Sequence, residues 1–412
     1  MLEIYKFFKE HSMPVAPHIS DFMASSSFIR KMFEEGMQLK QQYGADKVFD
    51  FSIGNPDLEP PAKINEMLRE LGESQESRLH AYMPNAGYPE TRKAMAEKVS
   101  GEQGVEIPFT HIVMGCGAAG AMNSVLKAIL SPGDEVLVSA PYFVEYGQYV
   151  RNHGGNLVTV PAREDFSLDI AAIGAALNGK TAAIIINSPN NPTGKIYSSD
   201  EMEQLGKTLE AHRATCGRTV MIISDEPYRE ITYNGKTVSP IFPWWKDTVV
   251  VSSFAKNLSL PGERIGYTAI CPDAENSLEL AEAVAYTTRI LGFVNAPATF
   301  QRIVAACWKE SVDYSVYEKR REILMEILDA AGIPFLTPEG AFYLFCRVPE
   351  RKHTTGEAGD DAAFCDHLKK YRILAVPGRG FGKAGWIRLA YCISERSIAL
   401  SRDAFIQAGS AW

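Results

Sequence analysis

The stretch from Thr248 to Tyr267 reads TVVVSSFAKNLSLPGERIGY, a β-branched strand that runs directly into polar and cationic residues. A lysine after a strand is usually a solvated loop residue, and Lys256 by itself would be interpreted in that way. Ser253 and Arg264 change this interpretation, because both can donate hydrogen bonds to a phosphate while Lys256 reaches a neighbouring carbonyl carbon. The stretch therefore indicates a site for an anionic ligand that carries a carbonyl group.

Strand-like runs of the same kind occur on both sides of this stretch and alternate with helical segments. This alternation is typical of a parallel sheet with crossover helices. The expected strands are His111–Met114, Glu135–Ser139, Leu157–Val160, Ala182–Asn187, Val220–Ser224, Thr248–Ser252 and Gly266–Cys271. Seven such strands predict one open, doubly wound α/β domain. Ligands of these domains lie outside the carboxyl ends of the strands, so the residues that follow each strand matter most.

Asp225 and Tyr228 follow one of these strands, in Asp225-Glu226-Pro227-Tyr228. An aspartate in this position can simply be a helix N-cap. It can also pair with the protonated nitrogen of a pyridine ring and keep the ring cationic, which strengthens the ring as an electron sink. Tyr228 would then donate a hydrogen bond to the phenolic oxygen of that ring.

Two loops at other strand ends fit the same kind of ligand. The loop Ser188–Gly194 reads SPNNPTG, which by composition is only a turn, yet after a buried strand it would present the Asn191 amide to the same ring oxygen. The loop Gly115–Gly120 reads GCGAAG between a strand and a helix, where small residues and free N–H groups accept a phosphate. Its letters match G-x-G-x-x-G, but glycine-rich turns between a strand and a helix are common, and it is not a Walker A loop, so it does not by itself indicate nucleotide binding.

In this order, S-P-N-N-P-T-G, S-D-E-P-Y, S-F-A-K-N-L-S-L-P-G-E-R-I-G-Y and W-I-R-L-A-Y resemble the class I/II aminotransferases of the aspartate aminotransferase superfamily. The resemblance extends from about Phe51 to Leu400. It implies the α/β architecture of fold-type I pyridoxal-phosphate transferases, with a mostly parallel seven-stranded sheet between helices and a smaller α/β domain. The implied cofactor is pyridoxal 5′-phosphate. The implied reaction moves an amino group from an L-amino acid, such as aspartate or an aromatic one, to a 2-oxo acid such as 2-oxoglutarate by ping-pong.

The resemblance also implies a role for each matching residue. Lys256 would be the Schiff-base lysine and proton shuttle, with Asp225 at the ring nitrogen and Tyr228 at the ring oxygen. Asn191 would also contact the ring oxygen, and Phe143 would stack on the ring, with Tyr142 as a substitute. The implied phosphate contacts are Ser253, Arg264, Ala118 and Ala119. Tyr82 would reach the phosphate bound by the neighbouring subunit. Arg388 would bind the substrate α-carboxylate, helped by Asn191 and the Gly54 backbone. A site built from two chains implies a homodimer.

The sequence indicates less clearly which residue recognises the substrate side chain than which residues bind the cofactor. One branch of the family binds a distal carboxylate with a lysine in the glycine-rich loop, where this chain has Ala118 and Ala119. Another branch uses an arginine of the partner subunit, and Arg289 precedes Asn295 at nearly the required spacing. We hypothesise that Arg289 binds an acidic side chain; the alternative is a helix-surface arginine. The scaffold also hosts C–S β-lyases and decarboxylases, so the alternative enzyme is a pyridoxal-phosphate-dependent lyase. A non-enzymatic alternative is the cofactor-binding sensory domain of a transcription regulator.

Composition narrows the class of protein. The 412 residues carry 42 basic and 50 acidic side chains, a net charge of −8, which argues against nucleic acid or an anionic membrane as a partner. The apolar runs are strand-sized, well below the roughly 20 residues of a membrane span. The 7 cysteines form no C-x-x-C pair, which predicts reduced thiols and a cytoplasmic location. Nothing in this pattern indicates a metal site.

The chain is expected to divide into an N-terminal segment of the small domain (1–59), a large cofactor-binding domain (60–299) and the rest of the small domain (300–412). We expect a continuous helix over Phe300–Ala331, with the charges of residues 318–322 on one face. Short strands are expected around Phe342–Arg347 and Trp386–Tyr391, with a helix at Asp361–Lys370. The segment Met1–Ser12 is interpreted as an interfacial helix or an upstream extension, without room for a DNA-binding segment.

Overall fold

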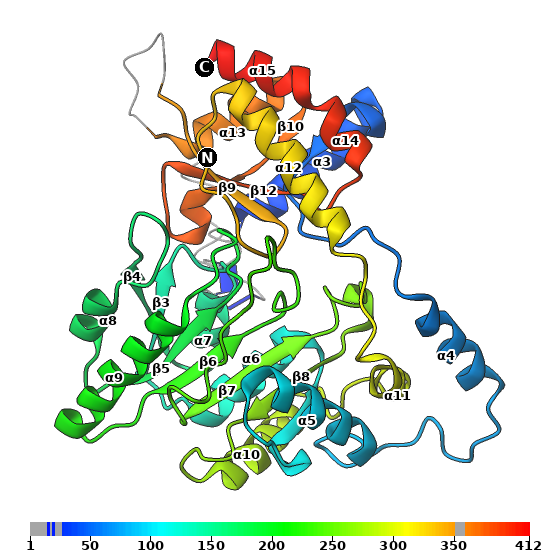
Figure 1. Cartoon of the computed structure of the whole chain (residues 1–412), viewed down its shortest axis with the longest axis vertical. Helices are drawn as coiled ribbons and strands as arrows, with labels where there is room; N and C mark the ends of the chain where they lie inside the picture. The colour runs from blue at the N-terminus through cyan, green and yellow to red at the C-terminus, as the bar shows by residue number, and fades with distance from the viewer. Residues whose placement is uncertain (1–14, 17–18, 21–26, 351–358) are drawn as a thin grey trace.

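A computed structural model describes residues 15–16, 19–20, 27–350 and 359–412 of the chain. Figure 1 shows two lobes, a large one that contains the main sheet and a small one that carries the C-terminus. The expected element at Met1–Ser12 lies outside the described residues. The chain enters the small lobe first, passes through the large lobe, and returns to the small lobe.

The large lobe is built on a seven-stranded sheet. Its strands lie in the order β2 (Ile112–Gly115), β8 (Gly266–Ile270), β7 (Thr248–Ser253), β6 (Met221–Asp225), β5 (Thr181–Asn187), β3 (Glu135–Ala140) and β4 (Asn156–Pro161). All pairs are parallel except those that β8 makes with β2 and β7. Every expected strand is present, and both its ends lie within one residue of the prediction. The predicted fold class is confirmed.

Helices cover both faces of this sheet. They are α4 (Ala62–Glu73), α5 (Pro89–Gln103), α6 (Gly117–Ile129), α7 (Tyr146–Asn152), α8 (Ile170–Ala176), α9 (Ser199–Cys216), α10 (Ser277–Ile290) and α11 (Ala298–Cys307), with the 3₁₀ turns η2 (Phe109–His111) and η3 (Pro261–Glu263). Successive strand residues point to opposite faces, so Ile184 joins the core beneath α5, α8, α9 and α11, while Ile185 joins the core beneath α6, α7 and α10. Burial on both faces explains why β5 is apolar from Ala182 to Ile186.

The small lobe contains two short sheets. One is antiparallel, in the order β11 (Val376–Pro377), β12 (Trp386–Ala390) and β9 (Tyr343–Arg347); the other pairs β1 (Phe49–Asp50) with β10 (Ile373–Leu374). Its helices are α3 (Ser27–Tyr43), α12 (Ser315–Ala331), α13 (Asp361–Lys370), α14 (Glu395–Leu400) and α15 (Arg402–Ala411), with η1 (Ala45–Lys47) and η4 (Gly378–Phe381). Phe49 and Phe51 pack into this lobe's core, so the N-terminal segment and the C-terminal part share one core.

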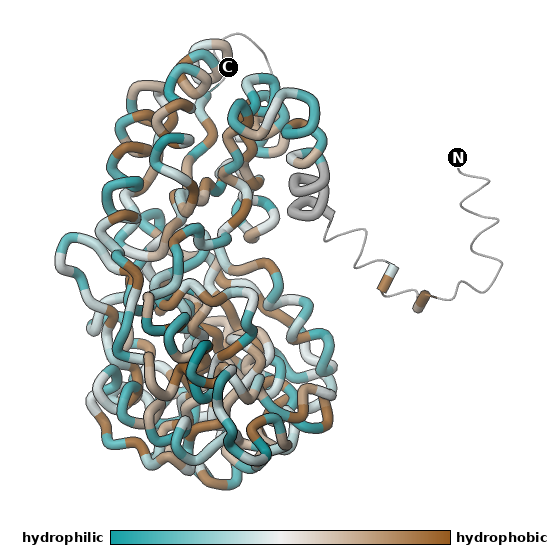
Figure 2. Tube along the Cα trace, turned by 90° about the vertical axis from the view of Figure 1, so that its right-hand side faces the viewer, coloured by the Kyte–Doolittle hydropathy of each residue, from teal (hydrophilic) through white to brown (hydrophobic). Residues whose placement is uncertain are grey.

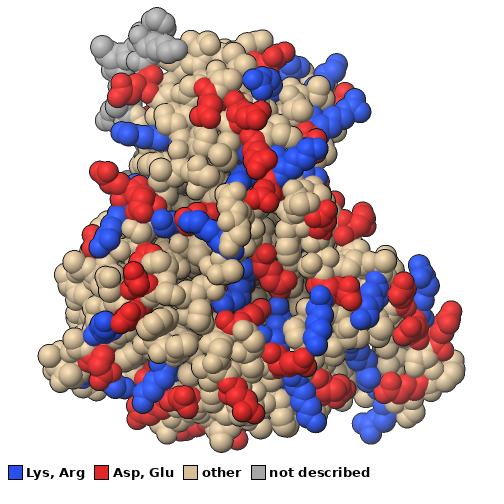
Figure 3. Space-filling view, viewed as in Figure 1, with Lys and Arg blue, Asp and Glu red and all other residues tan. Residues whose placement is uncertain are grey.

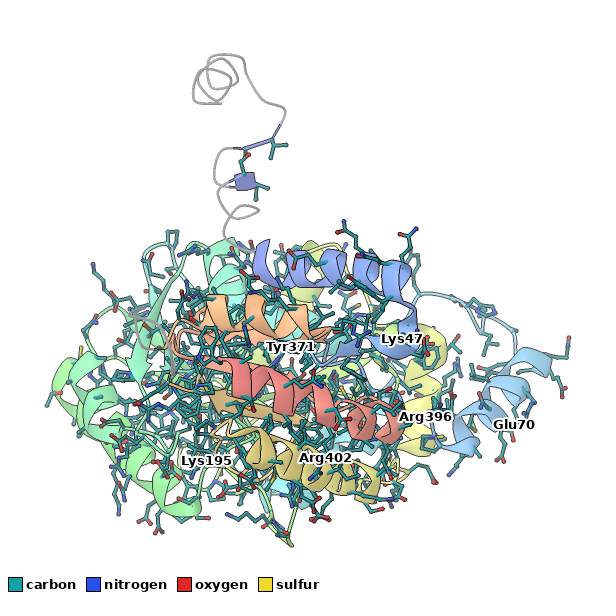
Figure 4. The ribbon with its side chains drawn as sticks, turned by 90° about the horizontal axis from the view of Figure 1, so that it is seen from above. Lys47, Glu70, Lys195, Tyr371, Arg396 and Arg402 are labelled. Carbon is teal, nitrogen blue, oxygen red and sulfur yellow. The ribbon has the colours of Figure 1, made fainter. Side chains whose placement is uncertain are left out.

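Figures 2 and 3 show how hydropathy and charge are distributed over the two lobes. In the rotated view of Figure 2, hydrophobic and hydrophilic stretches alternate along the chain in both lobes. Acidic and basic side chains are mixed over the face drawn in Figure 3. Seen from above, Glu70 lies on α4 at one edge of the molecule, and Arg396 and Arg402 lie on the two C-terminal helices (Figure 4).

The expected continuous helix over Phe300–Ala331 is wrong. The chain leaves α11 after Cys307 and starts α12 at Ser315. A tertiary contact interrupts the helix, because the Val312 N–H donates to the Asn257 carbonyl. Locally, Asp313 accepts a hydrogen bond from the Ser315 N–H at the start of α12. The apolar contacts change here as well, with Cys307 in the large-lobe core and Val312 in the small-lobe core. The expected domain limits, including a boundary near residue 300, stay a prediction.

The expectation that the charges of residues 318–322 lie on one face is also wrong, because consecutive residues of a helix point in different directions. Arg320 and Arg321 are 6% and 3% exposed. Arg320 makes a bidentate ion pair with Asp57 at 2.6 and 3.0 Å, and Arg321 donates to the Pro338 carbonyl. Both guanidinium groups connect segments distant in sequence, which the local charge pattern did not indicate.

The sheet order fixes where a ligand can bind. From β3 the chain passes outward to β4 and then returns to β5 on the other side of β3, which creates a topological switch point. Ligands of doubly wound sheets bind outside the carboxyl ends of the strands at such points. The ends of β5, β6 and β7 carry Asn187, Asp225 and Ser253, and the small lobe lies beyond them (Figure 1).

Candidate active site

A cavity of about 930 Å³ lies at these strand ends, between the two lobes. Most of the expected site residues line it: Gly54, Ala118, Ala119, Phe143, Asn191, Asp225, Tyr228, Ser253, Lys256, Arg264 and Arg388. They come from both lobes and from five strand-end segments of the large sheet. One chain therefore gathers every expected group except Tyr82 and Arg289.

Tyr82 and Arg289 lie outside this cavity. Tyr82 is 88% exposed and borders a separate surface hollow with Phe293 and Asn295. Arg289 is an exposed residue in the last turn of α10. Because both were expected to act on the neighbouring subunit, their predicted roles stay predictions.

Lys256 projects into the cavity from the end of β7. Its Nζ donates a 3.0 Å hydrogen bond to the Gly54 carbonyl of the small lobe. Burial lowers the pKa of Lys256 to about 8, and the positive charges of Arg388 and Arg264 act in the same direction. A lysine with this pKa holds a substantial neutral fraction near neutral pH, as a nucleophile and general base require.

Asp225 lies at the end of β6 and is almost completely buried. Its Oδ2 accepts a 2.5 Å hydrogen bond from the Tyr146 hydroxyl, while Oδ1 is buried and has no hydrogen-bond partner among the described residues. Burial raises the pKa of Asp225 to about 7, although the Tyr146 hydrogen bond lowers it. An unpaired carboxylate oxygen costs free energy in such a place unless a bound group donates to it.

Hydrogen bonds between neighbouring strand ends fix the positions of the loops of the site. The Asn187 amide donates to the Asp225 carbonyl at 2.9 Å, and the Asn187 side-chain oxygen accepts from the Asn191 N–H at 2.7 Å. Asn191 and Asp225 are thus fixed to the ends of adjacent parallel strands. This explains why an Asn-Pro-Thr-Gly loop follows β5.

Arg388 of β12 reaches the cavity from the small lobe and is 5% exposed. Its guanidinium donates to the Ser52 carbonyl at 2.7 Å and to Asn191 Oδ1 at 3.2 Å, and its Nε has no partner among the described residues. The group stacks against the rings of Tyr343 and Phe381. A planar cation held in this way can bind a carboxylate with two parallel hydrogen bonds.

The Tyr228 hydroxyl also faces the cavity. It forms a 2.9 Å hydrogen bond with the Tyr343 hydroxyl, and Tyr343 in turn lies against the backbone of Gly54. A Cβ at position 54 would overlap the Tyr343 hydroxyl, so a residue without a side chain is required there. The expected contact of Tyr228 with a ring oxygen stays a prediction.

The expected phosphate contacts lie together because of strand pairing. Gly266 of β8 is opposite both Ser253 of β7 and Gly115 of β2. A side chain on Gly266 would collide with the Ser252 carbonyl and with Gly117, so glycine permits this close approach. The glycine-rich turn, Ser253 and Arg264 consequently meet beside the N-terminus of α6, where free N–H groups attract anions.

Three tyrosines that line the cavity, Tyr146, Tyr149 and Tyr343, were not predicted. Tyr146, the first residue of α7, bonds to Asp225, and Tyr343 of β9 contacts Tyr228 and Arg388. Each of these two acts through a residue more than 40 positions away, so no local pattern could indicate it. Tyr146 follows the expected Phe143 by three residues in the sequence, and this proximity was the available signal.

Comparison with known proteins agrees with this geometry. The family described as "Aminotransferase class I and II" matches residues 46–400. The chain belongs to this family. A relative from Aquifex aeolicus named "Probable aspartate/prephenate aminotransferase" is 34% identical, over 85% of this chain and 88% of its own length.

Solved structures of family members superpose on nearly the whole chain. An aminotransferase from Eubacterium rectale has 37% identity and a TM-score of 0.90, covering 96% of this chain and 98% of its own. Aspartate aminotransferase from Thermus thermophilus with maleate has 29% identity and a TM-score of 0.80, covering 93% and 96%. As a family member, the protein is an amino-acid transaminase, and the lyase alternative is not favoured.

The described residues contain neither a membrane-spanning helix nor a cluster of metal ligands. No helix among them combines the length and apolar character of a membrane span. Nor do these residues contain three or more His, Cys, Asp or Glu side chains arranged to hold a metal ion. The seven cysteines are all free thiols.

Proposed function

We propose that the cavity holds pyridoxal 5′-phosphate and uses it to transfer an amino group from an L-amino acid to a 2-oxo acid. The observation that carries this proposal is the unpaired Asp225 Oδ1, buried in the cavity that also contains Lys256. A protonated pyridine nitrogen is the donor that this oxygen lacks. When bound, the cofactor supplies an electron-withdrawing ring that stabilises negative charge at the substrate α-carbon.

The residues of the chain attach the cofactor, move the proton and bind the substrate. Lys256 attaches the cofactor and, once freed, moves the α-proton, for which its lowered pKa suits it. Arg388 binds the α-carboxylate and orients the α-carbon over the ring. Phe143 covers one face of the ring and excludes water. Ser253, Arg264 and the backbone of Ala118 and Ala119 hold the phosphate, and Asn191 and Tyr228 the ring oxygen.

We further propose that the active form is a homodimer in the cytoplasm. Support comes from the exposed Tyr82 and from Tyr286, Ile290 and Phe293, large apolar side chains that stand 38 to 88% exposed. Such surfaces are typical of interaction sites. In this dimer Tyr82 would reach the phosphate bound by the second chain, and Arg289 would approach the substrate side chain there.

The test uses the protein loaded with the cofactor. Each of a panel of amino acids is mixed with it under single-turnover conditions, and absorbance follows conversion of the cofactor to its amino form. We expect at least one L-amino acid to convert the cofactor and an added 2-oxo acid to reverse the conversion. Release of pyruvate or an amine from one substrate, without transfer to the oxo acid, would contradict the proposal.

A further inference from the structure

The charges of the cavity are not all accounted for by the cofactor and the α-carboxylate. Among the described residues, five charged side chains line the cavity: Glu145, Asp225, Lys256, Arg264 and Arg388. The last four have roles in the proposed function. Glu145 has none, although it shares the cavity with them.

Glu145 is held by the start of α7. Its carbonyl accepts hydrogen bonds from the N–H groups of Gln148 and Tyr149 at 3.0 and 2.9 Å, so the backbone at this position is fixed. The residue lies between Phe143, expected over the ring, and Tyr146, which bonds to Asp225. Glu145 therefore lies in a wall of the cavity that also carries the residue expected over the ring and the residue that bonds to Asp225.

The Glu145 carboxylate has no cationic partner among the described residues. It is half-buried, and burial raises its pKa with no positive charge to counteract the effect. Its charge reaches the site, because burial together with Glu145 and Asp225 raises the pKa of Tyr149 to about 12, against the opposing charge of Arg264. A half-buried carboxylate without a partner is a position where a bound cation gains free energy.

Gln148 adds a second free acceptor on the same helix. Its Oε1 is buried, lines the same cavity and has no hydrogen-bond partner among the described residues. Carboxylate and amide oxygens only accept hydrogen bonds, so this wall requires a donor. Phe143 and Met122 supply apolar surface next to it.

We propose that Glu145 and Gln148 form the substrate side-chain subsite, that this subsite binds an amino acid with an ω-ammonium or guanidinium group, and that it disfavours dicarboxylic amino acids. The proposal rests on the proposed function and specifies the substrate class of that same site. A cationic end group would pair with Glu145 and donate to Gln148, while its methylenes lie on the apolar surface. A distal carboxylate would instead face a like charge, which is how sites exclude wrong substrates.

The test compares Glu145→Gln, which keeps the shape and removes the charge, with the wild-type holoenzyme. The matched control is Glu164→Gln, an exposed glutamate outside the cavity. Substrates are lysine, arginine, the neutral isostere norleucine, and glutamate. We expect the wild type to have a higher kcat/KM for lysine or arginine than for norleucine. Glu145→Gln should reduce the ratio of these two kcat/KM values about tenfold, as the loss of a hydrogen bond to a charged group predicts. Glutamate should improve relative to norleucine, and the control should change neither ratio.

A binding measurement separates this inference from the proposed function. Titration calorimetry compares 6-aminohexanoate with hexanoate, two carboxylates that lack an α-amino group, so that neither can be transaminated at the α-carbon. The wild-type preference for 6-aminohexanoate should be lost in Glu145→Gln, even if no amino acid is transaminated. An unchanged preference, a wild type that prefers glutamate, or a variant that only loses dimer stability would overturn the subsite. In the last case Glu145 would be paired with a second copy of the chain.

Discussion

The Tyr146 hydroxyl donates a 2.5 Å hydrogen bond to Asp225 Oδ2 and leaves the other carboxylate oxygen for a bound group. The two residues are 79 positions apart and come from α7 and β6. Tyr146 thus positions the carboxylate and favours its ionised form.

Replacing Tyr146 with phenylalanine should weaken cofactor binding. Loss of the hydrogen bond raises the pKa of Asp225 beyond about 7, so the carboxylate must be ionised at a cost before it can pair with the ring nitrogen. We expect the Kd for pyridoxal 5′-phosphate at pH 7 to rise about tenfold. Equilibrium titration of the apoprotein between pH 6 and 9 measures it, and the loss should shrink at high pH. Tyr371→Phe, which lies outside the cavity, is the control, and equal affinities in Tyr146→Phe and wild type would contradict the role.

Asp225→Asn should stabilise the apoprotein while impairing cofactor binding. The Asp225 pKa is about 7 in the folded chain and 3.8 as its ordinary value. Between these pH values the folded state keeps a proton that the unfolded state has lost, so the apoprotein loses stability as pH rises through that window. At pH 8 the variant should gain on the order of 3 kcal/mol over wild type, and nearly nothing at pH 4. Urea unfolding at both pH values tests this, and equal differences at the two would exclude it.

Lys256→Ala should abolish transamination while noncovalent cofactor binding persists. Removing a positioned base and nucleophile predicts a loss in kcat of at least about a thousandfold. Borohydride should fix the cofactor to wild type and not to the variant. In wild-type apoprotein the rate of cofactor attachment should rise with pH and level off above about 8, the pKa of Lys256. A rate that kept rising to about 10.4, the value of an ordinary lysine, would show that Lys256 is not shifted.

How far the sequence predicts this protein depends on the range of the interactions involved. The seven strands follow from alternation and turn residues, which are local, and the motif residues at their ends come together because parallel strands place those ends at one edge of the sheet. Tyr146, Tyr343 and the paired Arg320 were missed because their partners lie far away in sequence. The break before Ser315 was missed because a contact to Asn257 interrupts the helix. Asp313, which accepts from the Ser315 N–H, was the available local signal.

Two arginines should have separable effects on the substrate. Arg388→Lys keeps the charge and loses the fork that donates two parallel hydrogen bonds, so kcat/KM should fall at least about a hundredfold for every amino acid. Arg289→Ala should leave the ratio of acidic to neutral substrates unchanged if Glu145 sets the specificity, and a change in that ratio alone would show instead that Arg289 of the partner subunit binds acidic side chains. Steady-state kinetics with aspartate and norleucine measure both. If Arg289→Ala leaves kcat/KM for aspartate unchanged, Arg289 is a helix-surface residue.

A mixing experiment tests the two-chain site through Tyr82, which one chain leaves 88% exposed. In the proposed dimer, Tyr82→Phe weakens phosphate binding in the partner's site, and Lys256→Ala inactivates its own site. A hybrid of the two variants then contains one doubly altered site and one that is fully native. We therefore expect activity at low cofactor concentration to appear when the two variants are unfolded, mixed and refolded together, and to be absent from either variant treated alone. Mixing that restores nothing, although hybrids form, would mean that Tyr82 serves its own chain or only covers apolar surface.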